Sequence, residues 1–116
     1  MLKKFSLVFL QKENVLNKLL KKQRSQGGRV HILYTSLWDE TSQKLVETLK
    51  NKYGSEGGQE PLYVINSFTM PHSFVIFKTT HLPHLVILKD KTVSRVDYLP
   101  HVYHHLNVAT PSYAQF

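Results

Sequence analysis

Short apolar segments alternate with longer amphipathic ones along this chain, and that alternation limits the folds it can adopt. Apolar runs at Phe5–Leu10, Arg29–Thr35 and Leu62–Asn66 have the length and composition of buried strands. Between them, Glu13–Gln26 and a segment from Asp39 to about Tyr53 repeat apolar residues at the three-and-four spacing of a helix with one buried face. In the first of these segments the residues predicted to be buried are Val15, Leu16, Leu19 and Leu20. Strands joined by helical crossovers lie parallel in one sheet, so this part of the chain predicts an α/β fold.

The last third of the chain predicts an antiparallel addition to that sheet. Leu85–Lys89 and Thr92–Val96 flank Asp90 and Lys91, which is the pattern of a β-hairpin, although the usual turn glycine is missing and leaves the turn type open. Tyr98–Val108 predicts a short closing helix. Phe74–Phe77 fits a buried strand or one turn of a packed helix, because periodicity does not separate short apolar runs.

Together these segments predict a central mixed β-sheet of about five strands, the last two an antiparallel hairpin, flanked by about four helices. The chain has 116 residues, enough for one compact core and too few for two. We expect a single domain at residues 1–108 and a C-terminal tail at residues 109–116. Apolar stretches fall well short of the roughly 18 residues that span a bilayer, so we expect no transmembrane insertion.

Cysteine is absent, which excludes disulfides, thiol catalysis and cysteine-ligated metal. The absence of cysteine does not show whether the protein works in a reducing or an oxidising compartment.

We expect a cytoplasmic location, with the mitochondrion as the alternative because Lys and Arg dominate the first thirty residues.

Trp38, Asn66 and the segment from Leu82 to Val93 are features by which the sequence from Val30 to Leu106 resembles the thioredoxin family. Trp38 stands where that family has the Trp before its two cysteines, and Asn66 where it has the Asn that ends a strand. The segment from Leu82 to Val93 is similar to the family's Ile-Pro-Thr-Leu-x-x-Phe-Lys-Asn-Gly-x-Val. The resemblance implies a thioredoxin-like fold with a cis peptide bond before Pro83.

The departures from the family pattern lie at its redox centre. Asp39 and Ser42 occupy the two cysteine positions, and Leu33 replaces the buried acid that assists thiol deprotonation. The family's redox activity therefore does not carry over. Asp39 instead suits the N-cap of the following helix, where its carboxylate accepts from free backbone amides.

A peptide-contact edge is what the resemblance implies for the same region. The residues that would form this edge are Trp38, Asp39, Leu82, Pro83 and His84. The alternative interpretation is structural: the fold itself requires Pro83, and Trp38 covers an edge of the core.

Fifteen Lys and Arg against eight Asp and Glu give a net charge of +7, which favours acidic partners or merely keeps the chain soluble. The cations concentrate in the first quarter, where the candidate basic patch comprises Lys18, Lys21, Lys22, Arg24 and Arg29. Such a patch can contact nucleic-acid phosphates or form a plain solvated face. We expect Phe5 and Phe9 to be buried and unable to stack on bases.

Histidines and hydroxyls raise two further interpretations. His101, His104 and His105 share part of a helical face, and His81 and His84 flank Pro83, but carboxylates that would support a metal are scarce nearby. We assign no metal and no cofactor. A hydrolytic Ser42–His84–Asp39 arrangement lacks an oxyanion-hole motif.

Three functional hypotheses follow. The first is a non-catalytic protein-interaction module, a small subunit or accessory factor of a larger protein or ribonucleoprotein assembly. The second is nucleic-acid binding through the N-terminal basic face. The third is a non-redox enzyme that uses the former active-site groove through Asp39, Ser42 or His84.

Overall fold

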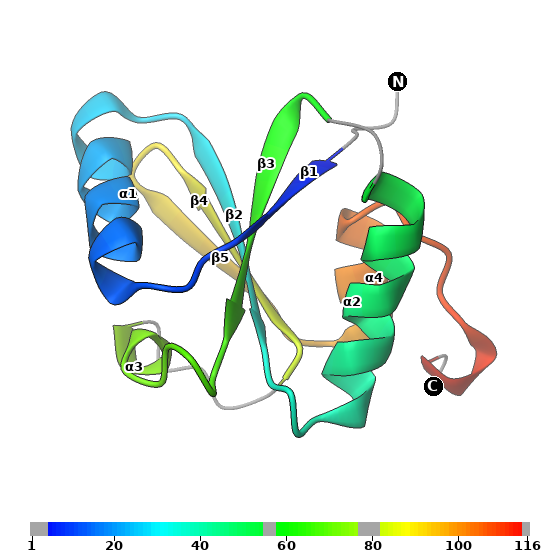
Figure 1. Ribbon diagram of the computed structural model, residues 1–116. Coiled ribbons are helices and arrows are strands. Elements are labelled where there is room, and N and C mark those ends of the chain that lie inside the picture. Colours follow the sequence, from blue (N-terminus) through cyan, green and yellow to red (C-terminus); the bar gives the residue numbers. More distant parts are fainter. Residues whose placement is uncertain (1–4, 55–57, 77–81, 115–116) are drawn as a thin grey trace.

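A mixed five-stranded sheet forms the centre of the molecule (Figure 1), in a computed structural model that describes residues 5–54, 58–76 and 82–114. The elements follow in the order β1 (Phe5–Phe9), α1 (Glu13–Gln26), β2 (Arg29–Thr35), α2 (Glu40–Tyr53), β3 (Glu60–Asn66), α3 (Ser73–Ile76), β4 (His84–Lys89), β5 (Thr92–Val96) and α4 (Leu99–His105), with a 3-10 turn at Ser112–Ala114. The strand order is β1-β3-β2-β4-β5. β1, β3 and β2 are parallel, whereas β4 and β5 are antiparallel to their neighbours. The predicted α/β architecture is confirmed.

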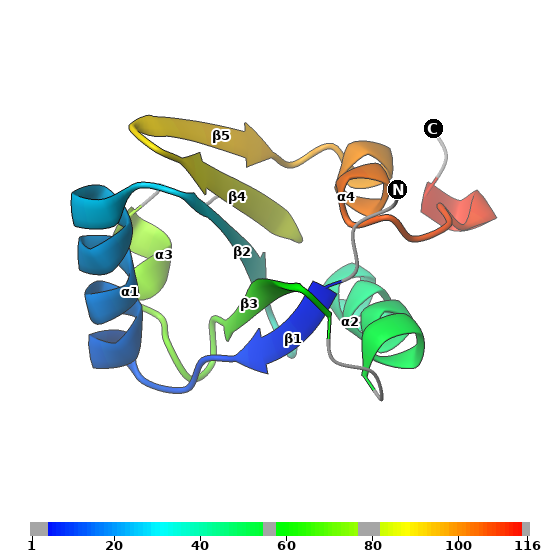
Figure 2. The same cartoon turned by 90° about the horizontal axis from the view of Figure 1, so that it is seen from above.

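Helices cover both faces of the sheet, with α1 and α3 on one side and α2 and α4 on the other (Figures 1 and 2). Successive side chains of a strand point to opposite faces, so β2 supplies both cores. Leu33 enters the core beneath α2 and α4, together with Leu45 and Leu85. Ile32 and Tyr34 enter the core beneath α1 and α3. β2 is therefore the strand on which both layers depend.

The structure settles the segments that the pattern left open. Ser73–Ile76 is a helical turn, which decides the ambiguity there, and Phe77 lies outside the described residues. The closing helix ends at His105, earlier than predicted, and Asn107 takes a left-handed φ of 57° just beyond it. β3 begins at Glu60, two residues before the predicted start.

One residue predicted to lie on the buried face of α1 is exposed. Leu16, Leu20 and Gln23 form the buried stripe of this helix, and Val15 is rotated about 100° from Leu16 around its axis. The prediction that Val15 is buried was wrong because the buried face of α1 is centred on Leu16, and Val15 lies to one side of it.

In the described ranges no helix has both the length and the apolar character to cross a membrane.

The hairpin turn between β4 and β5 is tied to the end of α1. Asp90 takes the left-handed conformation, with φ of 54°, in a turn that lacks the usual glycine. Its backbone N–H donates to the Gly28 carbonyl at 3.0 Å, and its Oδ1 accepts from the Gly28 N–H at 3.0 Å. The buried Gln23 side chain donates to the carbonyls of Asp90 and Gly28 at 2.8 and 3.2 Å. A Cβ on Gly27 would lie 3.0 Å from the Asp90 carboxylate, so the close approach favours glycine.

Replacing Gln23 by Ala tests how strongly these bonds stabilise the fold. Gln23→Ala leaves two carbonyl oxygens without their side-chain donor, so we expect the free energy of unfolding to fall by about 1–3 kcal/mol. Gln26→Ala is the matched control, since Gln26 is exposed on the same helix. Urea denaturation measures both, and equal midpoints for the two variants would contradict a stabilising role for Gln23.

Candidate functional site

The turn between β2 and α2 pushes two apolar side chains into solvent. Ser36 is buried at the base of this turn, where its carbonyl accepts from the Asp39 N–H at 3.2 Å and from the Gln43 side chain at 2.8 Å. Its hydroxyl oxygen accepts from the Trp38 N–H at 3.2 Å. Leu37 and Trp38 are consequently held on the outside, 55% and 84% exposed.

Asp39 and Ser42, which the sequence resemblance aligns with the family's two cysteines, lie together at the start of helix α2. Asp39 Oδ2 accepts from the Ser42 backbone N–H at 3.1 Å and from the Ser42 hydroxyl at 2.6 Å. Ser42 is fully buried. Its hydroxyl donates to a carboxylate, whereas a triad serine donates to a histidine. The pair therefore caps a helix and does not form the hydrolytic arrangement considered above.

Asn66, at the end of β3, ties a second turn to the first. Its side-chain Oδ1 accepts from the Leu37 N–H at 3.3 Å and from the Phe68 N–H at 3.0 Å. The Ser67 N–H donates to the Thr35 carbonyl at 2.9 Å, which joins the ends of β3 and β2 again. Phe68 is 64% exposed, so this second turn also presents a large apolar side chain.

We call Leu37, Trp38 and Phe68 the apolar rim. Sequence reasoning singled out Trp38 and missed Phe68, although a signal was present. Phe68 comes two residues after Asn66, at the carboxyl end of a strand parallel to β2. Ends of neighbouring parallel strands meet at one edge of a sheet, so the two turns had to be close.

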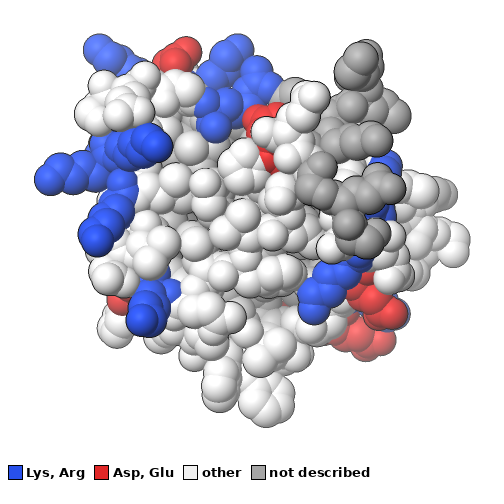
Figure 3. Space-filling view, turned by 45° about the horizontal axis from the view of Figure 1, so that its top comes forward, with Lys and Arg blue, Asp and Glu red and all other residues white. Residues whose placement is uncertain are grey.

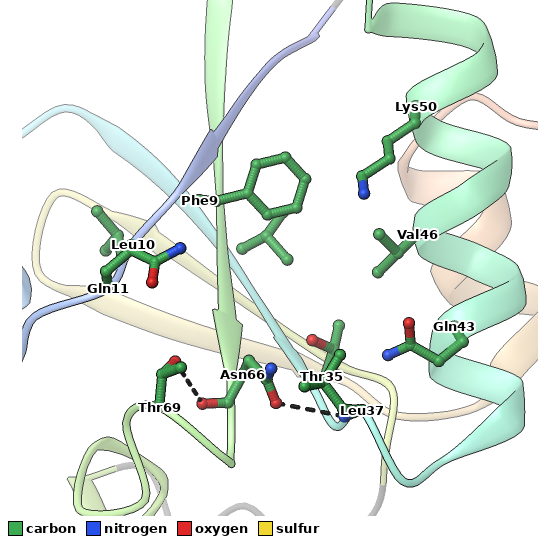
Figure 4. A pocket seen from close by; sticks show the side chains of 11 residues that line it. Phe9, Leu10, Gln11, Thr35, Leu37, Gln43, Val46, Lys50, Asn66 and Thr69 are labelled. Carbon is green, nitrogen blue, oxygen red and sulfur yellow. Dashed lines mark hydrogen bonds between the residues drawn. The ribbon is translucent and has the colours of Figure 1, made fainter.

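A cavity of about 160 Å³ lies beside the apolar rim, between the ends of β1 and β3 and the side of α2 (Figure 4). Phe9, Val46 and Val64 form part of its apolar wall, and Leu37 of the rim also lines it. Lys50 reaches from α2 toward the Phe9 ring, with 5.2 Å between its Nζ and the ring centre. Phe9 is 43% exposed, so the prediction of a buried Phe9 was wrong. β1 is an edge strand, which leaves one side of this ring open.

The proline loop contributes mainly to the core. The Leu82–Pro83 peptide bond is cis, as the resemblance implies. Pro83 and His84 are buried and Leu82 is half-buried. His84 pairs with Tyr34 across β4 and β2, with 6.4 Å between the ring centres, and burial raises the pKa of the Tyr34 phenol.

Of the five predicted contact residues, then, the structure leaves Trp38, Asp39 and Leu82 at least partly accessible and places Pro83 and His84 inside. That the five act as one peptide-contact edge stays a prediction. Because Pro83 and His84 are buried, only the side chains of Trp38, Asp39 and Leu82 could contact a peptide at this edge.

The predicted basic residues all lie at the surface. On α1, Lys18, Lys21 and Lys22 occupy the face opposite the buried stripe, whereas Arg24 lies beside that stripe and lines a cavity with Leu20. None of these four cations pairs with a carboxylate among the described residues. Arg29 is exposed at the start of β2. Figure 3 shows Lys and Arg gathered on the side that α1 forms, with a largely uncharged surface in the middle of the view.

The histidines considered as metal ligands do not assemble a site within the described ranges, where no three His, Asp or Glu side chains come together as ligands. His101, His104 and His105 are exposed on α4, and His81 lies outside those ranges.

Sheet order, helical layers and a cis-proline before β4 define a thioredoxin-like fold, here in a chain without cysteine. No protein-family model and no curated protein matches the sequence. Solved structures do match: Arabidopsis thaliana thioredoxin O2 at 19% identity and TM-score 0.65, covering 87% of this chain and 94% of that one. Schistosoma mansoni thioredoxin matches at 14% identity and TM-score 0.64, covering 88% of this chain and 94% of that one. Fasciola hepatica thioredoxin matches at 14% identity and TM-score 0.60, covering 85% of this chain and 95% of that one. At such identities the likeness shows the fold alone.

Substitution of Asp39 tests its role as a cap. Asp39→Ala removes both acceptor bonds to Ser42, so we expect the free energy of unfolding to fall by about 0.5–2 kcal/mol. Asn is a comparable N-cap residue, and Asp39→Asn is therefore expected to retain most of the stability. Thermal or urea denaturation measures both variants. An Ala variant as stable as the original chain would exclude a capping role.

Proposed function

We propose that this protein is a non-catalytic protein-interaction module, a small subunit or accessory factor of a larger protein or ribonucleoprotein assembly. The observation that carries the proposal is the apolar rim. Its three large apolar side chains lie on two turns that a single Asn66 oxygen holds together, next to a cavity with an apolar wall.

Single exposed apolar residues are ordinary on protein surfaces, whereas several at one place favour a contact site. Trp is enriched among the residues that dominate the binding energy of protein interfaces. Hydrogen bonds from main-chain N–H groups already fix both turns of the rim, so little ordering of the main chain would oppose association.

The local chemistry supports contact over catalysis. The chain has no cysteine for thiol–disulfide exchange. Asp39 and Ser42 are engaged with each other at the start of α2, and His84 is buried in the core. A non-redox enzyme acting through these three side chains would have to disrupt the cap, so we do not adopt that hypothesis.

The single tryptophan makes the proposal directly measurable. A partner isolated with the chain from native cells should shift Trp38 emission to shorter wavelength and reduce its quenching by iodide, because the exposed indole becomes covered. Trp38→Ala should weaken binding of the purified partner by more than about tenfold, a typical effect at an interface hot spot.

Tyr98→Ala provides the control, since Tyr98 is an exposed aromatic between β5 and α4. We expect it to change affinity by no more than about twofold. Unchanged Trp38 emission in the presence of a bound partner, or equal losses for the two variants, would contradict the proposal.

A second candidate function is nucleic-acid binding through α1, favoured by its four exposed cations, three of which lie on its outer face. Binding of labelled double-stranded DNA should then fall steeply with salt, with a slope of about −0.9 per phosphate contact in a plot of log K against log salt concentration. Replacing Lys18, Lys21, Lys22 and Arg24 by Glu should abolish it, while the same change at Lys50 and Lys52 of α2 should have a small effect. Absence of binding at low salt would exclude this function.

A further inference from the structure

Strand β5 forms one edge of the sheet. β5 pairs with β4 on one side, and no other strand of the described chain pairs with its second side. In an antiparallel pair alternate residues direct their N–H and C=O groups away from the partner strand, so the open edge offers a row of backbone donors and acceptors. The side chains from Thr92 to Arg95 are all exposed. An added strand would therefore meet no covering element of the described chain on this edge.

Next to this edge lies a cavity of about 250 Å³, which we call the hairpin notch. Leu20 of α1, Leu88 of β4 and Val93 of β5 supply its apolar lining, and Arg24 of α1 and Lys91 of the hairpin turn also line it. Val93 is 51% exposed. An apolar side chain entering the notch would cover surface that this chain leaves in solvent.

Strand register fixes which side chains of β5 face the notch. Val93 lies opposite Leu88 and Arg95 opposite Val86, and the side chains of Leu88 and Val86 belong to the core beneath α1 and α3. Val93 and Arg95 therefore project on that same face of the sheet. The apolar Val93 and the cationic Arg95 are thus two residues apart on the same face of the edge strand.

The walls of the notch are held in place before anything binds. Gln23 of α1 donates to the Asp90 carbonyl of the hairpin turn, and Asp90 and Gly28 exchange two further hydrogen bonds. Asp90 also lines the notch, but its Oδ1 already accepts from the Gly28 N–H. A preorganised recess loses less entropy when it is filled.

We propose that β5 binds an acidic, extended segment of a partner protein as an added strand, with one apolar side chain in the hairpin notch and a carboxylate two residues away against Arg95. Main-chain hydrogen bonds would supply affinity, and the alternating side chains would supply specificity. Arg24 and Lys91 in the notch and Arg95 on β5 outnumber the two nearby acidic groups, Asp90 in the notch and Asp97 just beyond β5. The whole chain has a net charge of +7. A second copy of this chain would bring the same cations against each other, so the charge favours a different, acidic partner.

This surface is distinct from the apolar rim. The hairpin turn is bonded to Gly28 at the start of β2, whereas Trp38 follows the end of that seven-residue strand. A strand of this length spans roughly 20 Å. Trp38 emission therefore reports on the rim and is silent for a segment bound at β5.

Selection from a library of random short peptides tests the proposal on the full chain, with uncoated beads as the background. We expect enriched peptides to share an apolar residue and, two positions away, Asp or Glu. A synthetic peptide of the enriched sequence should slow amide hydrogen exchange in β5 and leave Trp38 emission unchanged. Arg95→Glu should weaken its binding by about tenfold or more, the size expected when a close charge pair is reversed.

Lys18→Glu is the matched control, because it makes the same charge change on the outer face of α1, and we expect an effect of no more than about twofold. If Arg95→Glu fails to fold, Val93→Ser tests the proposal through the apolar contact in the notch and should also weaken binding. Enrichment no greater than the background, enriched peptides without an acidic residue, or equal losses for the two Glu variants would overturn the proposal. A peptide that shifts Trp38 emission and loses affinity with Trp38→Ala would overturn it too, while leaving the proposed function intact.

Discussion

Strand β2 is the element on which the rest of the molecule depends. It pairs with β3 on one side and β4 on the other, and its residues from His31 to Thr35 are buried. Its alternating side chains supply both cores, with Leu33 on one face and Ile32 and Tyr34 on the other. Even His31 is enclosed: its Nδ1 lies 3.3 Å from Glu60 Oε1, and burial lowers the pKa of its imidazole. Because β2 is fixed in this way, the turns at its two ends are fixed as well. The apolar rim lies at its carboxyl end, and the hairpin notch lies near its amino end.

At the carboxyl end of β2, this thioredoxin-like fold carries an Asp–Ser pair and no dithiol. Asp39 and Ser42 satisfy each other and the first turn of α2, which converts the two reactive positions into a helix start. The hydrogen bonds of Ser36 and Asn66 then direct Leu37, Trp38 and Phe68 outward. In this chain the turn presents an apolar surface and its two polar side chains are bonded to each other, which is why we favour binding over catalysis.

Much of the fold could be predicted because its helices and strands carry strong local patterns. α1 and α2 have clear amphipathic spacing, and Asp39 marks the start of α2 by its capping chemistry. The short α3 could not be separated from a strand, because four residues are too few to show a period. Phe9 and Val15 were misplaced because their exposure depends on which elements cover them, a tertiary property that local spacing does not contain.

The candidate sites were less predictable for the same reason. Phe68 joins Trp38 through Asn66, and the hairpin notch forms between α1 and a turn more than sixty residues later, so both depend on contacts that are distant in sequence. The resemblance to thioredoxins located the Trp38 turn but could not show that Pro83 and His84 are buried.

Photo-crosslinking from position 38 tests the central claim most directly. A photoreactive phenylalanine analogue placed at position 38 in native cells, with a parallel substitution at position 98, reports which proteins touch each site by mass spectrometry of the crosslinked products. Our account predicts one stoichiometric protein crosslinked from position 38 and absent from position 98. Crosslinks that are absent from position 38, or the same from both positions, would contradict it.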